Sequence, residues 1–485
     1  MNQVFLKIKA NHLFYLLLIL ILAAVNGCKV TKTELLKHPN VLFISIDDLN
    51  DWIEPLGGHP QAKTPNLSSL AEEGVCFTRA YCAGTACNPS RTALLTGMAP
   101  HNTGMYVNMQ VWREVLGDVQ TIPQYFTANG YWSAGAGKIF HNSQPDPRSW
   151  EDYYPSLERH MPRYFHPGNG KQVNMPDIEG LYDAFDWSPI DLEDDETADC
   201  GSVDWVIDQL NRQHDRPFFL ACGIYRPHLP WYVPKKYFDM FPLDSVKLPL
   251  VLADDRDDLP PGSLELNNRQ RRYHIPLIEN GLWEEAVQGY LASIAYSDAM
   301  LGRLLKGLEE SSYSDNTIIV LWSDHGWALG EKEHWRKFHI WNDIARVVCM
   351  IKVPEGTEAL PQGSSAGIKC NRVVSLMDLY PTLIELCNLP QNDDLYGRSL
   401  VPLLENPGLE WDHPAIIASS KMDFGISYGD WRYLWYHDNG GEELYNIIDD
   451  PHEWYNLAGD PDYEEILKKM RAYVPADPHP VVPWE

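Results

Sequence analysis

The chain has 485 residues, of which 44% are hydrophobic and 22% charged, a composition typical of a globular protein with one or two large cores. Its formal net charge of −28 argues against nucleic-acid binding, and a polysulfated ligand would need a local cluster of cations. Low-complexity segments and internal repeats are absent from the sequence, which excludes solenoid and largely disordered architectures.

The first 27 residues have the pattern of a signal peptide. Lys7 and Lys9 precede an apolar run over residues 13–25, which is short for a membrane-spanning helix. The following Cys28 stands in a loose version of the bacterial lipoprotein box, while an ordinary cleaved signal is the alternative. We therefore expect a signal peptide over 1–27, a linker over 28–37 and an exported bacterial protein. It would be periplasmic, or a lipoprotein of the outer membrane or cell surface held by a lipid anchor on Cys28.

Nine cysteines are present in the sequence. With Cys28 and Cys87 set aside by role, an odd number remains, so at least one thiol is unpaired. Export permits disulfides, and the sequence leaves both structural thiols and one or two bridges open. The cysteines concerned are Cys76, Cys82, Cys200, Cys222, Cys349, Cys370 and Cys387.

In two early segments of the sequence, a predicted strand or helix lies directly beside side chains that could take part in chemistry. The apolar run 41–46 predicts a strand buried on both faces, and it ends in Asp47 and Asp48. Residues 90–95 predict a helix whose first turn Pro89 favours, which places Cys87 at the positive end of that helix, where an anion is stabilised. A thiolate nucleophile and a disulfide with Cys82 are the alternative interpretations of this cysteine.

Two later apolar runs repeat the pattern of the first. Residues 217–223 lead to Arg226-Pro227-His228, and residues 317–322 lead to Ser323-Asp324-His325. Between them, residues 287–308 carry apolar side chains at a helical period. Alternating strands and helices predict a three-layer α/β sandwich with a large, mixed but mostly parallel sheet. Such folds place their chemistry at the carboxyl ends of the strands.

Near residue 405 the sequence pattern changes from alternating strands and helices to short strands. Short strands separated by Gly and Asp turns are predicted over 413–420, 431–437 and 443–447. We therefore divide the chain into a catalytic domain, 38–405, and a small antiparallel C-terminal subdomain, 406–485. The segments 150–200 and 250–280 are expected to be long loops around the mouth of the site. The second contains a basic cluster, which we interpret as a solvated patch, with a substrate clamp as the alternative: Arg269, Arg271, Arg272 and His274.

Three carboxylates follow the predicted strands. An isolated Asp pair after a strand is usually a turn or a helix cap. Together with Asp324, however, Asp47 and Asp48 form the ligand set that a hard divalent cation such as Ca2+ or Mg2+ prefers. The sequence therefore predicts a metal site at the carboxyl edge of the sheet.

The segment Cys87-Asn88-Pro89-Ser90-Arg91, with the Asp pair upstream and Ser323 to Gly326 downstream, resembles the signature of the sulfatase family. Residues 121–126 and 324–331 are most similar to the iduronate-2-sulfatase subgroup, and Glu443-Leu444-Tyr445 resembles the family's closing motif. The resemblance implies an alkaline-phosphatase-like fold. It also implies that a formylglycine-generating enzyme oxidises Cys87 to formylglycine (3-oxoalanine), whose hydrated aldehyde attacks the sulfur of a sulfate ester.

The same resemblance implies roles for individual residues. Asp47, Asp48, Asp324, His325 and the formylglycine oxygen at position 87 would hold Ca2+, with Mg2+ possible. Many sulfatases have Asn at the position of His325, so the histidine is a feature of the subgroup. Because a nitrogen ligand is less usual for Ca2+, His325 is the least secure ligand. The remaining positions would bind sulfate and move protons: Arg91, Lys138 and Lys337 on the sulfate and hydrate oxygens, His228 as proton donor to the leaving sugar oxygen, and His141 as base.

The expected substrate is a sulfated carbohydrate containing a uronic acid or deoxysugar, such as a glycosaminoglycan or an algal glycan like ulvan. Two alternatives remain open. One is a phosphate or phosphonate monoester hydrolase of the same superfamily. The Cys-x-Pro-Ser-Arg motif argues against it, because the phosphatases of that superfamily generally have Ser or Thr at the nucleophile position. The other is a catalytically silent glycan-binding protein on the cell surface, which would tolerate loss of Lys138, His228 or Asp324, all of which are present.

Overall fold

The centre of the fold is an eight-stranded sheet in the order β14-β2-β13-β9-β1-β7-β4-β5. Strand β13 is antiparallel to both of its neighbours, and the other adjacent pairs are parallel. This computed structural model describes residues 35–175, 181 and 184–484. The expected signal peptide, Cys28 and most of the expected linker lie outside the described residues. The strand bounds are β14 (Ile368–Cys370), β2 (Val75–Phe77), β13 (Cys349–Lys352), β9 (Thr317–Ser323), β1 (Asn40–Ile46), β7 (Phe218–Ile224), β4 (Trp132–Gly137) and β5 (Asp152–Tyr154).

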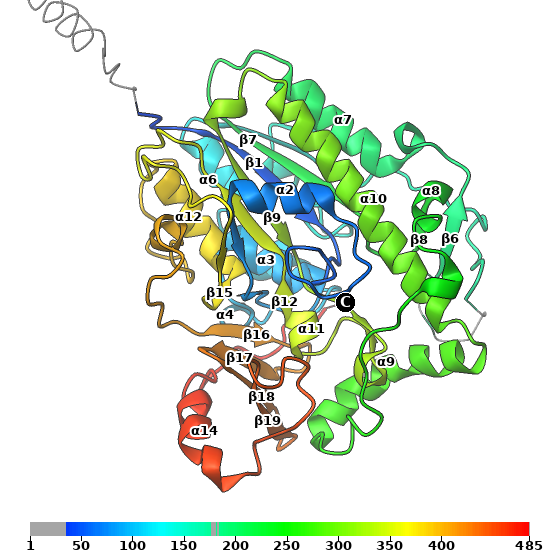
Figure 1. Ribbon diagram of the computed structural model, residues 1–485. Coiled ribbons are helices and arrows are strands. Elements are labelled where there is room, and N and C mark those ends of the chain that lie inside the picture. Colours follow the sequence, from blue (N-terminus) through cyan, green and yellow to red (C-terminus); the bar gives the residue numbers. More distant parts are fainter. Residues whose placement is uncertain (1–34, 176–180, 182–183, 485) are drawn as a thin grey trace, which may run out of the picture. The chain divides into compact units, whose positions relative to one another are not determined.

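The two faces of the sheet carry separate hydrophobic cores. Alternate side chains of a strand point to opposite faces, so Val41 and Phe43 of β1 enter one core while Leu42 and Ile44 enter the other. Helices α3 (Cys87–Thr96), α6 (Ile122–Ala128) and α12 (Leu379–Leu386) contribute to the first core. Helices α2 (Pro65–Glu73), α7 (Ala198–Leu210) and α10 (Trp283–Glu309) contribute to the second (Figure 1). The prediction of a three-layer α/β sandwich is therefore confirmed.

The three strands and the helix predicted around the site are confirmed to within a few residues. β1, β7 and β9 match the apolar runs 41–46, 217–223 and 317–322, and α10 contains the predicted helix 287–308. All seven residues of each of these strands are buried. Contiguous apolar residues signal such strands reliably because both faces of a central parallel strand are covered.

The prediction of loops over 150–200 and 250–280 is wrong in part. Helix α9 (Pro261–Glu279) fills most of the second segment, and β6 (Trp187–Ile190) and the start of α7 lie in the first. Helix α9 buries Leu266, Gln270, Tyr273 and Leu277, which share one face at a helical period. The other positions mix polar residues with exposed apolar ones such as Ile275 and Ile278, so the buried stripe does not stand out in the sequence.

The C-terminal region forms a four-stranded antiparallel sheet in the order β16-β17-β18-β19, followed by helix α14 (Glu464–Arg471). Three of these strands were predicted: β16 (Ala415–Ala418), β18 (Trp431–Tyr436) and β19 (Gly441–Asn446). Strand β17 (Phe424–Tyr428) was missed, since it is short and Gly425 weakens its strand pattern. The chain then returns to the segment after α4 (Pro100–Thr103), where Val482 N donates to Gly104 O at 3.1 Å.

The eight cysteines in the described part of the chain are all buried free thiols. The bridges left open by the sequence are therefore not formed among them, and the pairing of Cys87 with Cys82 is excluded. Across the described residues, no helix is both long enough and apolar enough to cross a membrane.

Candidate active site

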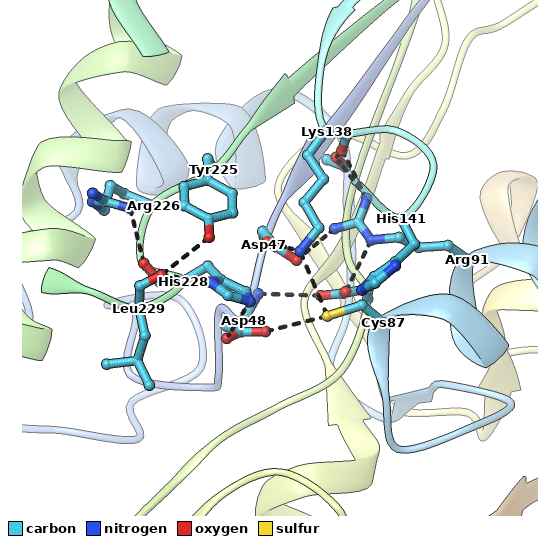
Figure 2. Close-up of polar contacts among 12 residues, drawn as sticks. Asp47, Asp48, Cys87, Arg91, Lys138, His141, Tyr225, Arg226, His228 and Leu229 are labelled. Carbon is cyan, nitrogen blue, oxygen red and sulfur yellow. Dashed lines mark hydrogen bonds and ion pairs between the residues drawn. The ribbon is translucent and has the colours of Figure 1, made fainter. Parts of the chain in front are cut away.

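Four adjacent parallel strands end at one edge of the sheet, and each delivers side chains to one cluster. Asp47 and Asp48 follow β1, Asp324 and His325 follow β9, His228 lies beyond β7, and Lys138 follows β4. Figure 2 shows the side chains of Asp47, Asp48, Lys138 and His228 pointing toward one another, with Cys87 and Arg91 entering from α3. The sequence had indicated three of these four strand ends. The position of Lys138 after β4 was reached only through the family resemblance.

The backbone at Asp48 explains how two consecutive carboxylates reach the same cluster. Asp48 has a φ of 59°, in the left-handed region that Asp tolerates better than most residues. Its amide N–H donates to Asp324 Oδ1 at 3.1 Å, and Tyr290 Oη donates to its carbonyl at 2.8 Å. On a regular strand, the side chains of Asp47 and Asp48 would point to opposite faces. The left-handed turn instead directs the Asp48 carboxylate toward Cys87 and His325, in the same cluster as Asp47.

Cys87 is the first helical residue of α3, with Ala86 as N-cap, so the helix begins three residues earlier than predicted. Its thiol is fully buried, and Sγ lies 3.0 Å from Lys337 Nζ, 3.4 Å from His325 Nε2 and 3.6 Å from Lys138 Nζ. Ser90, one turn into the helix, donates its hydroxyl to the carbonyl of Asp324 at 2.5 Å. The helix start is thereby tied to the end of β9.

Arg91 connects the two halves of the cluster. Its guanidinium donates to Asp47 Oδ1 at 2.8 Å and to Asp324 Oδ2 at 3.0 Å. It also donates to the carbonyls of Lys138 and Ile139, at 2.7 and 2.9 Å. The planar fork of arginine allows one buried side chain to hold acceptors in several directions.

The buried charges of the cluster balance each other. The three carboxylates of Asp47, Asp48 and Asp324 face three cations, and each acid contacts at least one of them. The partners are Arg91, Lys138 and Lys337; Lys138 Nζ contacts Asp47 Oδ2, and Lys337 Nζ lies 2.7 Å from Asp48 Oδ1. Pairing of this kind is what makes so many buried charges tolerable.

Burial and neighbouring charges determine the protonation states of the acids and the thiol in the cluster. Burial raises the pKa of Asp47 to about 7, although Lys138 lowers it. Burial also acts on Asp324, but Arg91, His325 and Lys138 together hold its pKa well below the usual range. Burial raises the pKa of the Cys87 thiol to about 12 despite the two lysines, so the side chain is a neutral thiol near pH 7.

The donor set fits a hard divalent cation. Ligand atoms of Asp48, Cys87, Asp324 and His325 lie within 4.8 Å of one another, and Asp48 Oδ2 is buried without a hydrogen-bond partner. His325 Nδ1 must donate to Gly326 O, 2.9 Å away, which leaves the lone pair of Nε2 facing the carboxylates. Burial lowers the pKa of His325, which favours the neutral form that a metal ligand needs.

Two further histidines flank the cluster. His228 Nδ1 donates to Leu229 O at 2.7 Å, and its Nε2 lies 3.7 Å from Asp48 Oδ2. His141 is bonded to Ser143 Oγ at 2.7 Å and lies close to Arg91 in Figure 2. Burial, reinforced by Lys138 and Lys337, lowers the pKa of both imidazoles well below the usual value. Both are neutral in the resting protein, and Nε2 of His228 is unprotonated.

Sequence reasoning missed the residues that orient His228 and Lys138. The ring of Tyr225 stacks on His228 with centroids 4.6 Å apart and lies 5.3 Å from Lys138 Nζ. Asp199, on α7, accepts from the backbone N–H of Tyr225 at 2.8 Å and of Arg226 at 3.2 Å. No motif surrounds Asp199, and its link to the site exists only through tertiary contact.

Both parts of the chain match models of known protein families, and the whole chain is similar to several known proteins. A family model described as Sulfatase matches residues 39–389, and one described as N-sulphoglucosamine sulphohydrolase, C-terminal, matches residues 330–476. The chain is 36% identical over 482 residues to a sulfatase of Formosa agariphila, with 95% of this chain and 91% of that protein covered. It is 30% identical to iduronate 2-sulfatase of Mus musculus, with 89% and 93% covered.

Solved structures show the same architecture. The phosphonate monoester hydrolase of Silicibacter pomeroyi superposes with a TM-score of 0.71 at 21% identity, covering 90% of this chain and 94% of that one. At this level of identity the likeness concerns the fold alone. The match, together with the large mixed sheet and the small C-terminal sheet, confirms the alkaline-phosphatase-like architecture.

Proposed function

The chain belongs to the sulfatase family, whose members hydrolyse sulfate esters. We propose that its substrate is a sulfated carbohydrate. Hydrolysis would convert the ester and water into sulfate and the free sugar hydroxyl. The names of two relatives support this class, iduronate 2-sulfatase and the ulvan-active sulfatase of Formosa agariphila. We propose a glycan with a sulfated uronic acid or deoxysugar, of the glycosaminoglycan or ulvan type.

The observation that carries the proposal is the charge-balanced cluster around Cys87. When Asp47 is ionised, three acids and three cations leave no net charge in the protein part of the site. A divalent cation held by Asp47, Asp48, Asp324, His325 and position 87 would make the site positive and supply Lewis acidity toward a sulfate oxygen. The buried cluster would then attract an anionic ester despite the acidic surface of the chain.

We propose that Cys87 is the precursor of formylglycine, installed by a formylglycine-generating enzyme. The pKa of about 12 for its buried thiol argues against thiolate chemistry at neutral pH. Formylglycine would supply a hydrate hydroxyl as nucleophile at the first turn of α3. Around that position Lys337 and Lys138 are within 3.6 Å of Sγ, where they can offset negative charge that develops on sulfate oxygens.

The histidines would handle protons. His228 Nε2 faces the cluster, and its neutral resting state means that it must take up a proton before it can act as an acid. An anionic sulfate beside the imidazole would raise its pKa. We propose that His228 then donates to the leaving sugar oxygen and that His141 serves as base on the opposite flank of Cys87.

Replacing His228 with alanine should therefore reduce hydrolysis of alkyl sulfates far more than that of aryl sulfates. The expected loss in kcat/KM is about 10²–10⁴-fold for a sulfated sugar, since an alkoxide is a poor leaving group without proton transfer. The measurement is a comparison of 4-nitrophenyl sulfate with the sugar substrate for the native and variant enzymes. Equal losses on both substrates would show that His228 is not the general acid.

Removing one metal ligand should empty the proposed metal site. For Asp48→Asn we expect at least about 100-fold weaker Ca2+ affinity, because the change removes the charge of a buried carboxylate whose Oδ2 has no hydrogen-bond partner among the described residues. Elemental analysis and calorimetric titration of the chelated protein would measure this. Glu54→Gln, at an exposed residue of the following loop, is the control and should bind normally. Full metal content in Asp48→Asn would count against the site.

The function itself is tested by sulfate release from a panel of sulfated glycosaminoglycan and algal oligosaccharides. The protein is co-expressed with a formylglycine-generating enzyme, and Cys87→Ala is the blank. Release from one sugar class, absent in the blank, supports the proposal and identifies the substrate. If mass spectrometry shows converted Cys87 but no sulfate is released, phosphate or phosphonate monoesters are tested next, followed by glycan binding without turnover.

We also propose an organisation and a location for the protein. Residues 38–405 would be the catalytic domain and 406–485 the C-terminal subdomain, following a signal peptide, 1–27, and a linker. Export would place the protein in the periplasm or on the cell surface, with a lipid on Cys28 as a membrane anchor. The composition of the signal region supports this location, and labelling with a radioactive fatty acid would test the anchor.

A further inference from the structure

A cavity of about 550 Å³ adjoins the reactive cluster, and none of the roles above uses it. Two of its wall residues are chain neighbours of reactive residues: Ala86 precedes Cys87, and Phe338 follows Lys337. A third, Asn108, accepts from the backbone N–H of Asn88 at 2.9 Å, one residue after Cys87. The cavity therefore begins at the backbone that carries the nucleophile position.

Three arginines line this cavity. Arg269 and Arg272 extend from α9, three residues apart and thus on one side of the helix, and Arg336 comes from β11 (Trp335–Arg336). None of the described residues that line the cavity is acidic. In a chain with a net charge of −28, an all-basic set of charged wall residues marks a local surface suited to an anion.

The arginines differ in how they are held. Arg336 is buried; it donates to Tyr273 Oη at 2.7 Å, and its guanidinium lies 5.0 Å from the Tyr273 ring and 5.3 Å from the Phe338 ring. Arg272 is exposed and lies 5.3 Å from the Tyr273 ring, and Arg269 forms an exposed pair with Glu265 at 3.4 Å. Because exposed pairs of this kind contribute little, both α9 guanidinium groups can turn to a ligand at small cost.

Aromatic and apolar side chains supply the rest of the wall. Tyr106 and Phe338 come from the catalytic region, and Trp484 comes from the returning C-terminal segment. Met109 and Trp484 are 55% and 45% exposed, unusual for side chains of this size at a cavity mouth. Flat rings beside charged groups are typical of pockets that bind a pyranose through its apolar face and its substituents.

We infer that this cavity binds the sugar next to the one that carries the scissile sulfate, and that Arg269 and Arg272 pair with an anionic substituent of that neighbouring sugar. The substituent is a carboxylate or a second sulfate, which share the geometry that arginine recognises with two parallel hydrogen bonds. This inference rests on the proposed carbohydrate sulfatase function and extends it from the scissile group to the flanking unit.

The basic cluster seen in the sequence thus divides into two parts. Arg269 and Arg272 line the cavity, whereas Arg271 pairs with Glu333 and His274 accepts from Trp335 Nε1 at 3.0 Å. Arg269 and Arg272 are exposed, as expected of a solvated patch, and also line the cavity, whereas Arg271 and His274 are bonded within the fold. Arg271 is consequently a matched control, since it carries the same charge on the same helix but does not line the cavity.

The test uses binding to Cys87→Ala, so that no ligand is consumed. Two pairs of disaccharides are compared by calorimetry. In the first pair, a 2-sulfated uronic acid is linked to glucosamine that is either N-sulfated or N-acetylated. In the second, a sulfated rhamnose is linked to glucuronic acid or to its carboxyl-reduced counterpart. Each pair is measured in Cys87→Ala alone, with Arg269→Gln and Arg272→Gln added together, and with Arg271→Gln added.

We expect the anionic member of at least one pair to bind about tenfold more tightly than its neutral counterpart in Cys87→Ala. This preference should fall to within about twofold when Arg269 and Arg272 are both glutamine, and it should persist with Arg271→Gln. The pair that shows the effect identifies the anion as sulfate or carboxylate. Circular dichroism of all variants should be the same, since the changed side chains are on an exposed face of α9.

Two results would overturn the inference, and they can be told apart. If the disaccharides bind but the preference survives in the double glutamine variant, or is absent from the start, the cavity assignment is wrong while the proposed function stands. If no disaccharide binds and the native enzyme releases no sulfate from any of them, the proposed carbohydrate substrate fails and the inference fails with it.

Discussion

Replacing Cys87 with alanine should abolish sulfate release, with a fall in kcat of at least about 10⁴-fold, and should leave the free energy of unfolding almost unchanged. The loss of activity follows from removing the only precursor of the proposed nucleophile. Stability should change by less than about 1.5 kcal/mol, because only one small buried atom is lost and alanine suits the first turn of a helix. Sulfate release and urea unfolding measure the two effects separately.

Cys82→Ala is the matched control for this experiment. Cys82 is also a fully buried free thiol, but none of the hydrogen bonds and ion pairs described above for the cluster involves it. This variant should keep its turnover after co-expression with the converting enzyme. Turnover in Cys87→Ala would refute the nucleophile assignment. A collapse of its thermal stability would instead show that the thiol is mainly a packing element.

Arg91→Ala should produce a different result, with both activity and stability lost. Arg91 is 0% exposed, and its removal would leave the carboxylates of Asp47 and Asp324 without their shared partner. Breaking a buried ion pair on one side costs about 3–5 kcal/mol, and here Asp324 would lose its cation while Asp47 would keep Lys138. Urea unfolding of the unmodified Cys87 form would measure this cost without interference from catalysis.

Two comparisons sharpen the Arg91 experiment. Arg148→Ala removes an arginine from an exposed ion pair with Asp118 and should cost no more than about 1 kcal/mol. Arg91→Lys keeps the charge but cannot reach Asp47, Asp324 and two carbonyl oxygens at once, so its stability should be intermediate. If Arg91→Ala unfolds at the same urea concentration as the native protein, the guanidinium does not hold the site together.

The sequence predicted the central strands well because their signal is local. In β1 and β9 every residue is buried, so both appear as unbroken apolar runs that end at polar residues. Because the carboxyl ends of parallel strands lie at one edge of the sheet, the sequence alone predicts that Asp47, Asp48 and Asp324 lie close together. The structure agrees with that juxtaposition, while the roles proposed for these residues await the variants described above.

What the sequence did not reveal depends on contacts between distant segments. Helix α9 looked like a loop because only a narrow stripe of it is buried, and the Arg269 side of the helix faces a cavity instead of a core. Tyr225 and Asp199 support the site through stacking and backbone hydrogen bonds, and neither contact leaves a pattern in the linear chain. The left-handed turn at Asp48 is likewise invisible in a pair of aspartates.

The complete burial of Cys87 determines whether a modifying enzyme can reach this residue before or after the protein folds. A modifying enzyme needs the thiol and several flanking residues in its own active site, yet every residue of α3 is buried between the sheet and its covering helices. The proposed oxidation of Cys87 would therefore have to take place on the nascent or unfolded polypeptide, before α3 docks. Under this proposal, a molecule that folds with an unconverted cysteine would stay inactive even if the converting enzyme were supplied later.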